Sequence, residues 1–404
     1  MSALVSVEWL KHHLEQPNLV VLDATYFLPN TGRSAEHEFL DQHIPGARRF
    51  DHDVIVDRES AYPHMRPSLD HWRDAMGALG IREDSEVIVY DALGLFSAPR
   101  CWWLFRSFGH RSVRILNGGL PAWIRAEGPV TSGVSIHSST EYQGGHDYGS
   151  EMAVDAVGVQ EALASGTAVI DARGAARFQG LELEPRPGLR SGHIPGSANL
   201  PFTDLIDPDL GQLYSHDALG AVLDRLVPDS STRFVVSCGS GVTACIIALA
   251  QYELKRPDVI VYDGSWAEWG SRVELPIASG QSGARERPSM TGTQPPDNNP
   301  AIRTIAMPAD TNPSGDIFGG WLMAQMDLAA GNTAGRVARG RCATIAVDGI
   351  LFLKPVYVGD EVSLFAELES VGRTSMKIKV EAWRRSRDGD ESEKVTEEIG
   401  RAHV

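Results

Sequence analysis

Short apolar runs alternate with helix-like segments along the first 270 or so residues of the chain. The runs are rich in β-branched residues and end at Asp, Gly or Cys, as in EVIVYDA (86–92) and RFVVSCG (233–239). Helical patterns lie between them, for example HDALGAVLDRL (216–226). Apolar strands that alternate with helices predict an α/β fold, with a parallel sheet covered on both faces. In such sheets, sites form beyond the carboxyl ends of the strands.

The same landmarks occur twice along this region. Asp171 lies 148 positions after Asp23 (171 − 23), and Cys238 lies 147 positions after Asp91 (238 − 91). Such even spacing predicts two copies of one fold, in residues 1–130 and 151–275, joined by a Ser/Gly-rich linker around 131–150. The matching segments are LVVLDAT (19–25) and AVIDAR (168–173), HIPGAR (43–48) and HIPGSAN (193–199), EVIVYDA (86–92) and RFVVSCG (233–239), and NGGLPAW (117–123) and DGSWAEW (263–269).

The pattern changes after the second copy. Residues 276–300 are rich in Pro, Gly, Ser, Gln and Asn, which predicts a flexible linker. An apolar helical pattern over 318–338 follows. One helix followed by strands of antiparallel character predicts a separate α+β domain in 301–404. The strand patterns cover 343–353, 360–372 and 374–385.

Length and charge narrow the classes of function. With 404 residues, the chain is long enough for two or three domains. Its net charge of -16 argues against nucleic acid and anionic membrane surfaces as partners, because phosphate groups bind clustered Lys and Arg. No apolar run approaches the roughly 20 residues of a membrane span. The N-terminal segment 1–15 lacks a signal-peptide core, so we expect a cytoplasmic protein.

The four cysteines show neither a C-x-x-C pair nor zinc spacing, so we expect no metal and no cofactor. In a reducing compartment they remain thiols. Cys101, Cys245 and Cys342 are expected to be small core residues, as free cysteines commonly are.

Cys238 is different, because it stands where an apolar strand ends and the Gly-rich loop CGSGVT (238–243) leads into the helical pattern 244–254. Only the thiolate is a good nucleophile, and a free thiol has a pKa of about 8.5. Backbone N–H groups at a helix N-terminus, together with the helix dipole, stabilise an anion there. The first copy has Asp91 and the segment ALGLFSAPR (92–100) instead, so the second copy is predicted to be catalytic and the first non-catalytic.

Three alternatives remain for this loop. In the first, Cys238 is a buried residue before an ordinary turn; in the second, the chain is a non-catalytic sulfur carrier or binding module; in the third, it is a cysteine phosphatase. The last reading requires an Arg six residues after the Cys, and that position is Ala244.

The repeat, the two HIPG turns and the loop CGSGVTA (238–244) resemble the rhodanese superfamily, and most nearly its 3-mercaptopyruvate sulfurtransferase branch. The resemblance covers about 1–275. It implies that Cys238 takes the outer sulfur of a donor, holds it as a persulfide, and passes it to a thiol, thioredoxin or cyanide. Thiosulfate-preferring relatives carry basic residues after the Cys. Gly239 and Ser240 stand there in this chain, which favours 3-mercaptopyruvate over thiosulfate. By the same resemblance, the donor site is lined by Gly239, Gly241, Val242 and Thr243.

The resemblance also assigns roles outside the loop. Arg177 and Arg186, in DARGAARFQGLELEPRPG (171–188), match two arginines that bind the carboxylate and carbonyl of the donor. The planar guanidinium group suits this role because it meets a carboxylate with two hydrogen bonds. Ser240, His64 and Asp53 match a relay that protonates or deprotonates the donor.

Residues 301–396 resemble hotdog-fold acyl-CoA thioesterases. The resemblance implies a catalytic acid at Asp327, a polar partner at Asn312, and sites between protomers, hence a homo-oligomer. Asp327 stands among Met326, Leu328 and Ala329, an apolar setting that raises a carboxyl pKa.

After KVTE (394–397) the family pattern continues into a core strand, whereas this chain ends EIGRAHV (398–404). We therefore expect the hotdog domain to be incomplete, with a missing strand and an exposed sheet edge.

The sequence thus predicts a sulfurtransferase with an appended thioesterase-like domain. The alternative is an acyl-CoA hydrolase whose rhodanese half is a sulfur carrier.

Overall fold

The computed structural model describes residues 2–29, 31–280, 299–311, 317, 319–352, 356–371, 375–386 and 392–403, with only the backbone described for 345–352, 369 and 397–403. The chain divides into two compact units, Met1–Glu286 and Arg287–Val404. Among the described residues, no helix is both long enough and apolar enough to cross a membrane.

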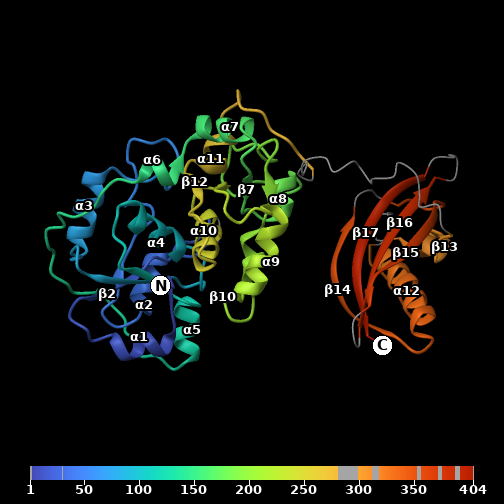
Figure 1. The fold of residues 1–404 in the computed structure, drawn as a ribbon, viewed down its shortest axis with the longest axis horizontal. Coiled ribbons are helices and arrows are strands. Elements are labelled where there is room, and N and C mark those ends of the chain that lie inside the picture. Colours follow the sequence, from blue (N-terminus) through green and yellow to red (C-terminus); the bar gives the residue numbers. More distant parts are fainter. Residues whose placement is uncertain are drawn as a thin grey trace. The chain divides into compact units, whose positions relative to one another are not determined.

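The first copy forms a parallel sheet in the order β1-β5-β4-β2-β3 (Figure 1, blue to teal). Its central strands are apolar on both faces, which fits a sheet covered by helices on each side. The elements are β1 (Leu4–Val5), α1 (Val7–His13), β2 (Leu19–Asp23), α2 (Ala35–Asp41), β3 (Arg48–Arg49), α3 (Leu69–Ala78), β4 (Glu86–Tyr90), α4 (Ala98–Ser107), β5 (Val113–Leu116) and α5 (Gly119–Arg125).

The second copy repeats this topology strand for strand, in the parallel order β6-β12-β11-β7-β8. A short antiparallel hairpin of β9 and β10 is added to it. The elements are α6 (Gly149–Met152), β6 (Ala153–Val154), α7 (Ala156–Ala164), β7 (Val169–Asp171), α8 (Ala175–Gln179), β8 (Ala198–Asn199), η1 (Phe202–Leu205), β9 (Ile206–Asp207), β10 (Gln212–Leu213), α9 (His216–Leu226), β11 (Val235–Ser237), α10 (Ala244–Glu253), β12 (Ile260–Tyr262) and α11 (Ser265–Trp269).

One hydrophobic core runs through both copies, and each copy has a further, smaller core of its own. Every residue of α4 is buried, and α10 is apolar on nearly all sides, because these helices pack against each other between the sheets. The predicted linker 131–150 also packs against the first copy. The Thr140 amide donates to the Gly77 carbonyl, and the buried Tyr142 joins the core.

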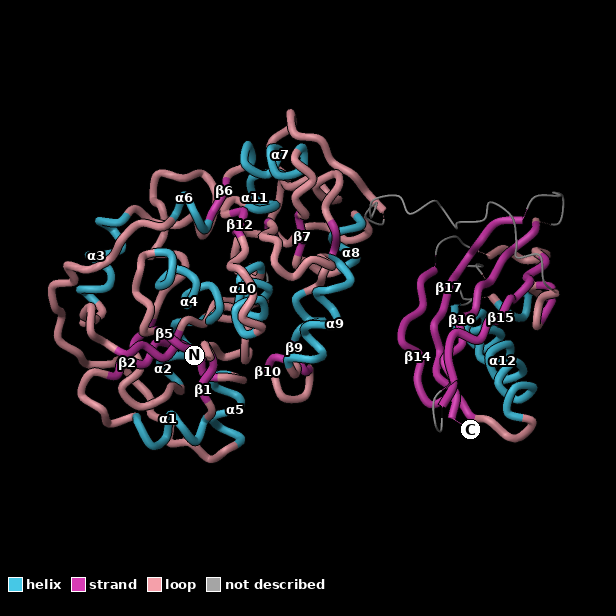
Figure 2. The backbone as a smooth tube through the Cα atoms, in the orientation of Figure 1, coloured by secondary structure: helices cyan, strands magenta, loops and turns pink. Residues whose placement is uncertain are grey.

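The C-terminal unit is an antiparallel sheet that wraps around one long helix, so the predicted α+β domain is confirmed. Figure 2 shows α12 as a single helix running along the strands. The sheet order is β13-β15-β16-β17-β14. The elements are β13 (Ile302–Ile305), η2 (Pro308–Asp310), α12 (Gly319–Ala338), β14 (Ala343–Phe352), β15 (Glu361–Val371), β16 (Ser375–Arg385) and β17 (Ser392–His403).

The prediction of a missing strand at the end of the chain is wrong. The strand β17 pairs with β16 on one side and β14 on the other, as far as His403. Backbone pairing does not depend on which side chains the strand carries, and Val395 and Thr396 are fully buried. The edges of this sheet are therefore β13 and β14. Most of the predicted linker 276–300 lies outside the described residues.

Candidate active site

Cys238 directly follows β11, at the carboxyl edge of the second sheet, and the loop 238–243 leads into α10. The thiol-bearing residue is only 1% exposed. The Ser265 hydroxyl holds the loop in shape, because Oγ accepts the N–H groups of Cys238 and Gly241, each at 3.1 Å. The same hydroxyl donates to the Tyr262 carbonyl at 2.7 Å, so its hydrogen-bonding capacity is filled.

Other amides of this loop are left free. Within the described residues, no acceptor in the chain forms a hydrogen bond with the N–H groups that follow Cys238 and begin α10. These are the amides of Gly239, Ser240, Val242, Thr243 and Ala244. Unpaired amides at a helix N-terminus are available to a bound anion. The loop therefore has the donor groups that the sequence predicted for an anion cradle.

Ser265 occupies a backbone conformation that glycine adopts more readily. Its φ is +49°, and the matching residue of the first copy, Gly119, has φ +55°. The left-handed conformation costs an L-residue roughly 1–2 kcal/mol. A serine at this position, where the other copy uses glycine, is explained by the two loop amides that its hydroxyl holds.

Both predicted arginines lie beside the loop. A Cβ on Gly239 would be 3.2 Å from an Arg177 guanidinium nitrogen and 4.0 Å from one of Arg186. Arg177 is ion-paired with Glu184, whose side chain is 2% exposed and also binds Arg173 at 2.7 Å. Arg186 donates to the Tyr26 hydroxyl at 3.0 Å. The guanidinium groups are thus oriented by partners before any ligand is present.

The structure brings Ser240, His64 and Asp53 together from the two copies. His64 Nδ1 lies 2.9 Å from Ser240 Oγ, and His64 Nε2 lies 3.0 Å from Asp53 Oδ1. With the proton on Nε2 facing the carboxylate, Nδ1 is free to accept the Ser240 hydroxyl proton.

Burial lowers the pKa of His64, so this histidine is neutral near pH 7. The hydrogen bond from His64 lowers the pKa of Asp53, which remains a carboxylate. Burial likewise raises the pKa of Tyr26, whose ring packs edge-on to His64 with centroids 4.6 Å apart. His64 is therefore neutral, as a general base must be, and Asp53 carries the negative charge that can orient it.

The remaining cysteines of the first unit are protonated thiols. Burial raises the pKa of Cys245 to about 12 and the pKa of Cys101 well above its ordinary value. Cys342, in the other unit, is half-buried.

Sequence reasoning missed Ser265, Glu184 and Tyr26. A signal for Ser265 was present, since DGSWAEW carries Ser where NGGLPAW carries Gly. The contacts of Tyr26 join segments 160 positions apart, which one sequence does not reveal.

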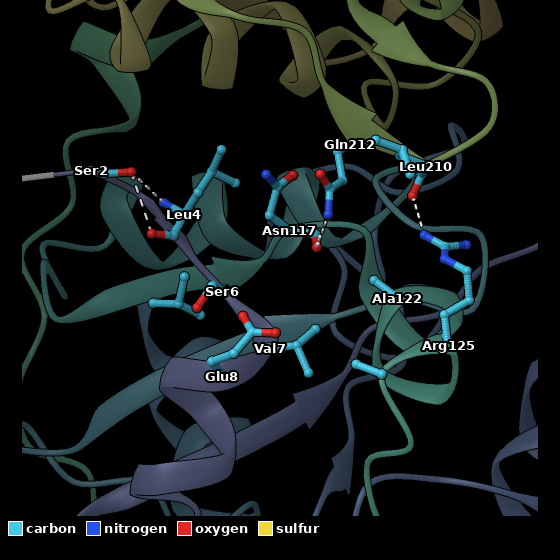
Figure 3. Close-up of a pocket in the computed structure, with 12 residues that line it drawn as sticks. Ser2, Leu4, Ser6, Val7, Glu8, Asn117, Ala122, Arg125, Leu210 and Gln212 are labelled. Atoms are coloured by element: carbon cyan, nitrogen blue, oxygen red, sulfur yellow. Dashed lines mark hydrogen bonds between the residues drawn. The ribbon is translucent and has the colours of Figure 1, made fainter.

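A pocket of about 600 Å³ lies elsewhere in this unit, between the start of α1 and the hairpin β9–β10 (Figure 3). Hydrogen bonds in this region join the two copies: Arg125 donates to the Leu210 carbonyl at 2.6 Å, Gln212 donates to the Asn117 carbonyl at 3.4 Å, and Ser2 Oγ donates to Glu253 at 2.8 Å. The pocket contains none of the predicted site residues and belongs to the seam between the copies.

In the C-terminal unit, Asp327 is exposed and its carboxylate accepts a hydrogen bond from Thr344 Oγ1. The predicted apolar setting is not formed within a single chain. Met326 and Ala329 face the sheet, whereas the helical period turns Asp327 and Leu328 outward. Asn312 lies outside the described residues.

Fold and site together define a tandem α/β protein with a cysteine in an amide-lined loop at the carboxyl edge of its second sheet. The rhodanese-like domain family matches residues 6–126 and 155–272, and the thioesterase superfamily matches 314–389. The chain belongs to the rhodanese family, with a C-terminal hotdog thioesterase domain.

Its relatives include sulfurtransferases of animals and bacteria. The human 3-mercaptopyruvate sulfurtransferase is 43% identical over 278 residues, which cover 67% of this chain and 93% of the relative. The Escherichia coli K12 enzyme of the same name is 41% identical over 275 residues, covering 68% and 96%. The crystal structure of SseA, a 3-mercaptopyruvate sulfotransferase from Escherichia coli with the rhodanese fold, aligns with a TM-score of 0.59 at 39% identity, covering 66% and 99%.

Proposed function

We propose that this chain transfers sulfur from 3-mercaptopyruvate, through a persulfide on Cys238, to an acceptor thiol such as that of thioredoxin, or to cyanide. The observation that carries the proposal is the loop itself. The amides that follow Cys238 in this loop have no acceptor in the described part of the chain, and two guanidinium groups lie beside Gly239. Thiosulfate is the second donor to test, because relatives of this chain include thiosulfate sulfurtransferases.

In the first step, the Cys238 thiolate attacks the sulfur of the donor thiol. A sulfur–sulfur bond forms and the carbon–sulfur bond breaks, leaving the enolate of pyruvate. Arg177 and Arg186 bind the carboxylate and carbonyl oxygens of the donor, where negative charge develops as the enolate forms. The amides of the loop stabilise the sulfur anion at Cys238.

The relay moves one proton during this step. Neutral His64 accepts the Ser240 hydroxyl proton as that hydroxyl takes the proton of the donor thiol, and Asp53 stabilises the resulting imidazolium. The proton then returns through Ser240 to the enolate carbon, which completes pyruvate. In the second step an acceptor thiolate attacks the outer persulfide sulfur and releases the Cys238 thiolate.

The decisive variant is Cys238→Ser, assayed as pyruvate release from 3-mercaptopyruvate with a thiol or cyanide as acceptor. We expect the activity to disappear, because a hydroxyl in this loop forms no persulfide. Cys342→Ser, which alters a cysteine in the other unit, is the matched control and should keep the activity of the unaltered chain. A Cys238→Ser chain that retains most of its rate removes Cys238 as the nucleophile.

A second activity, hydrolysis of an acyl-CoA thioester, is proposed for the C-terminal unit. The specific observation is the exposed carboxylate of Asp327 on α12, oriented by Thr344 Oγ1 within the region that matches the thioesterase superfamily. Asp327 would act on water or the thioester in a site shared between protomers, which makes a homo-oligomer part of this proposal.

The test is release of free CoA from acyl-CoA substrates of several chain lengths. Asp327→Asn should abolish hydrolysis and leave sulfur transfer unchanged. Equal hydrolysis by Asp327→Asn and the unaltered chain would exclude Asp327 as the acid.

A further inference from the structure

Arg100 is a fully buried residue on the first turn of α4, in the copy without the active cysteine. Its guanidinium group spans three segments of the site. Nη2 donates to the His64 carbonyl at 2.7 Å and to Asp263 Oδ1 at 2.6 Å, and Nη1 approaches the Gly241 carbonyl at 3.4 Å. A planar group with several fixed donors is suited to hold several acceptors at once.

Asp263 completes the arrangement from the second copy. Its other oxygen, Oδ2, accepts the Arg66 amide at 2.7 Å. The segment 64–66 is therefore held at both ends, by Arg100 at the His64 carbonyl and by Asp263 at the Arg66 amide. The same ion pair abuts the cysteine loop, because a Cβ on Gly241 would lie 2.9 Å from the Asp263 carbonyl and 3.2 Å from Arg100 Nη1.

The backbone at His64 needs such support. Its φ is +61°, in the left-handed region that non-glycine residues rarely adopt. Strained residues of this kind persist only where surrounding contacts fix them, and they gather at functional sites. The imidazole must nevertheless meet Ser240, which belongs to the other copy, at 2.9 Å.

We propose that Arg100, through its ion pair with Asp263, is the positioning residue that holds His64 against Ser240. The inference rests on the proposed sulfur transfer, in which His64 and Ser240 move the proton. Within the described residues Arg100 makes no hydrogen bond to the Cys238 thiol. Its contacts are with Asp263, the carbonyls of His64 and Gly241, and the Cys245 thiol, so we infer that it acts by holding His64 in place against the cysteine loop. Its loss should therefore slow persulfide formation without weakening donor binding by Arg177 and Arg186.

A double-mutant cycle on the full chain tests this inference. The rate of persulfide formation at Cys238 is measured in single turnovers with saturating 3-mercaptopyruvate, for Arg100→Lys, His64→Ala and the double variant. Lysine keeps the buried charge opposite Asp263 but lacks the planar fork. Loss of a general base typically slows a step about 10²–10⁴-fold, which sets the scale for His64→Ala.

We expect Arg100→Lys to slow loading about 10-fold or more, within that range of effects. The double variant should load no more slowly than His64→Ala alone, because residues that act as one unit are not additive. The apparent dissociation constant of the donor should be unchanged. Losses that multiply in the double variant would show that Arg100 acts independently of His64, and would overturn the inference.

Arg106→Lys is the matched control. Arg106 lies on the same helix, is 8% exposed, and pairs with Asp258 across the copies at 3.1 Å, away from His64 and Ser240. It should load at the rate of the unaltered chain. If Arg100→Lys does not fold, the nearly isosteric Asp263→Asn takes its place in the cycle, with the same expected result. A chain that forms no persulfide without any substitution would instead overturn the proposed function.

Discussion

The hydroxyl of Ser265 holds the cysteine loop in shape, and its hydrogen bonds set how much stability is lost when it is removed. Ser265→Ala removes the acceptor of two amides, those of Cys238 and Gly241, in a site closed to water. A buried donor left without a partner costs about 1–3 kcal/mol. With two such donors, the free energy of unfolding of the first unit should fall by about 2–6 kcal/mol.

Ser265→Gly separates the contribution of the two hydrogen bonds to stability from the cost of the positive φ. Glycine loses the same two bonds, but it adopts φ near +49° without the penalty of roughly 1–2 kcal/mol that an L-residue carries. Glycine also loses more chain entropy on folding, by about 0.5–1 kcal/mol. The glycine variant should thus be less stable than the unaltered chain, yet about 0.5–1 kcal/mol more stable than Ser265→Ala.

Urea unfolding of the full chain, followed by tryptophan fluorescence, measures these differences. Trp266 and Trp269 lie on the same helix as Ser265 and report on this region. Ser271→Ala is the control, since its hydroxyl only donates to the Glu268 carbonyl, and its loss should cost about 1 kcal/mol or less. A Ser265→Ala chain as stable as Ser271→Ala would refute the role of the hydroxyl. A glycine variant less stable than the alanine variant would refute the argument from φ.

Three further predictions concern the surroundings of the site. Tyr26→Phe removes one partner of Arg186, worth about 1 kcal/mol, so it should raise KM for 3-mercaptopyruvate about 5-fold at constant kcat; a loss confined to kcat would contradict this. Asp53→Asn should slow persulfide formation only about 10-fold, because Asp53 is largely exposed, and a loss as large as that of His64→Ala would argue against this ranking. Burial, reinforced by His64 and Arg100, lowers the pKa of His52 from 6.5 to about 3. The unfolded chain then binds the extra proton between these values, so stability falls by up to about 1.4 kcal/mol per pH unit as the pH drops below 6.5. In His52→Gln, the fall in the free energy of unfolding per pH unit should be smaller by that contribution when acid unfolding is measured. An unchanged fall would show that His52 is not buried in its neutral form.

The sequence predicted the α/β part well because its signals are local and occur twice. The strands that precede Asp91 and Cys238, β4 and β11, occupy matching places in two sheets of the same order. The helix predicted at 216–226 is α9. The relay residues came from a resemblance, yet the structure places Ser240 and Asp53 each within hydrogen-bond distance of His64.

What the sequence did not predict depends on contacts between distant segments. Ser265 and Arg100 support the site, but nothing in their local sequence shows this, because both reach the cysteine loop only through the tertiary fold. The error at the end of the chain has a different origin. The departure of residues 398–404 from the family pattern argued against a core strand, but β17 is fixed by backbone bonds to two neighbouring strands, which the side-chain pattern alone does not report.

The central claim is that the sulfur at the end of β11 accepts a second sulfur atom from a donor. Mass spectrometry of the full chain after brief treatment with 3-mercaptopyruvate, without acceptor and followed by thiol blocking and digestion, tests this directly. We expect a gain of one sulfur atom on the peptide that contains Cys238, and its loss when an acceptor thiol is added. An unmodified Cys238 peptide beside a steady release of pyruvate would contradict the account.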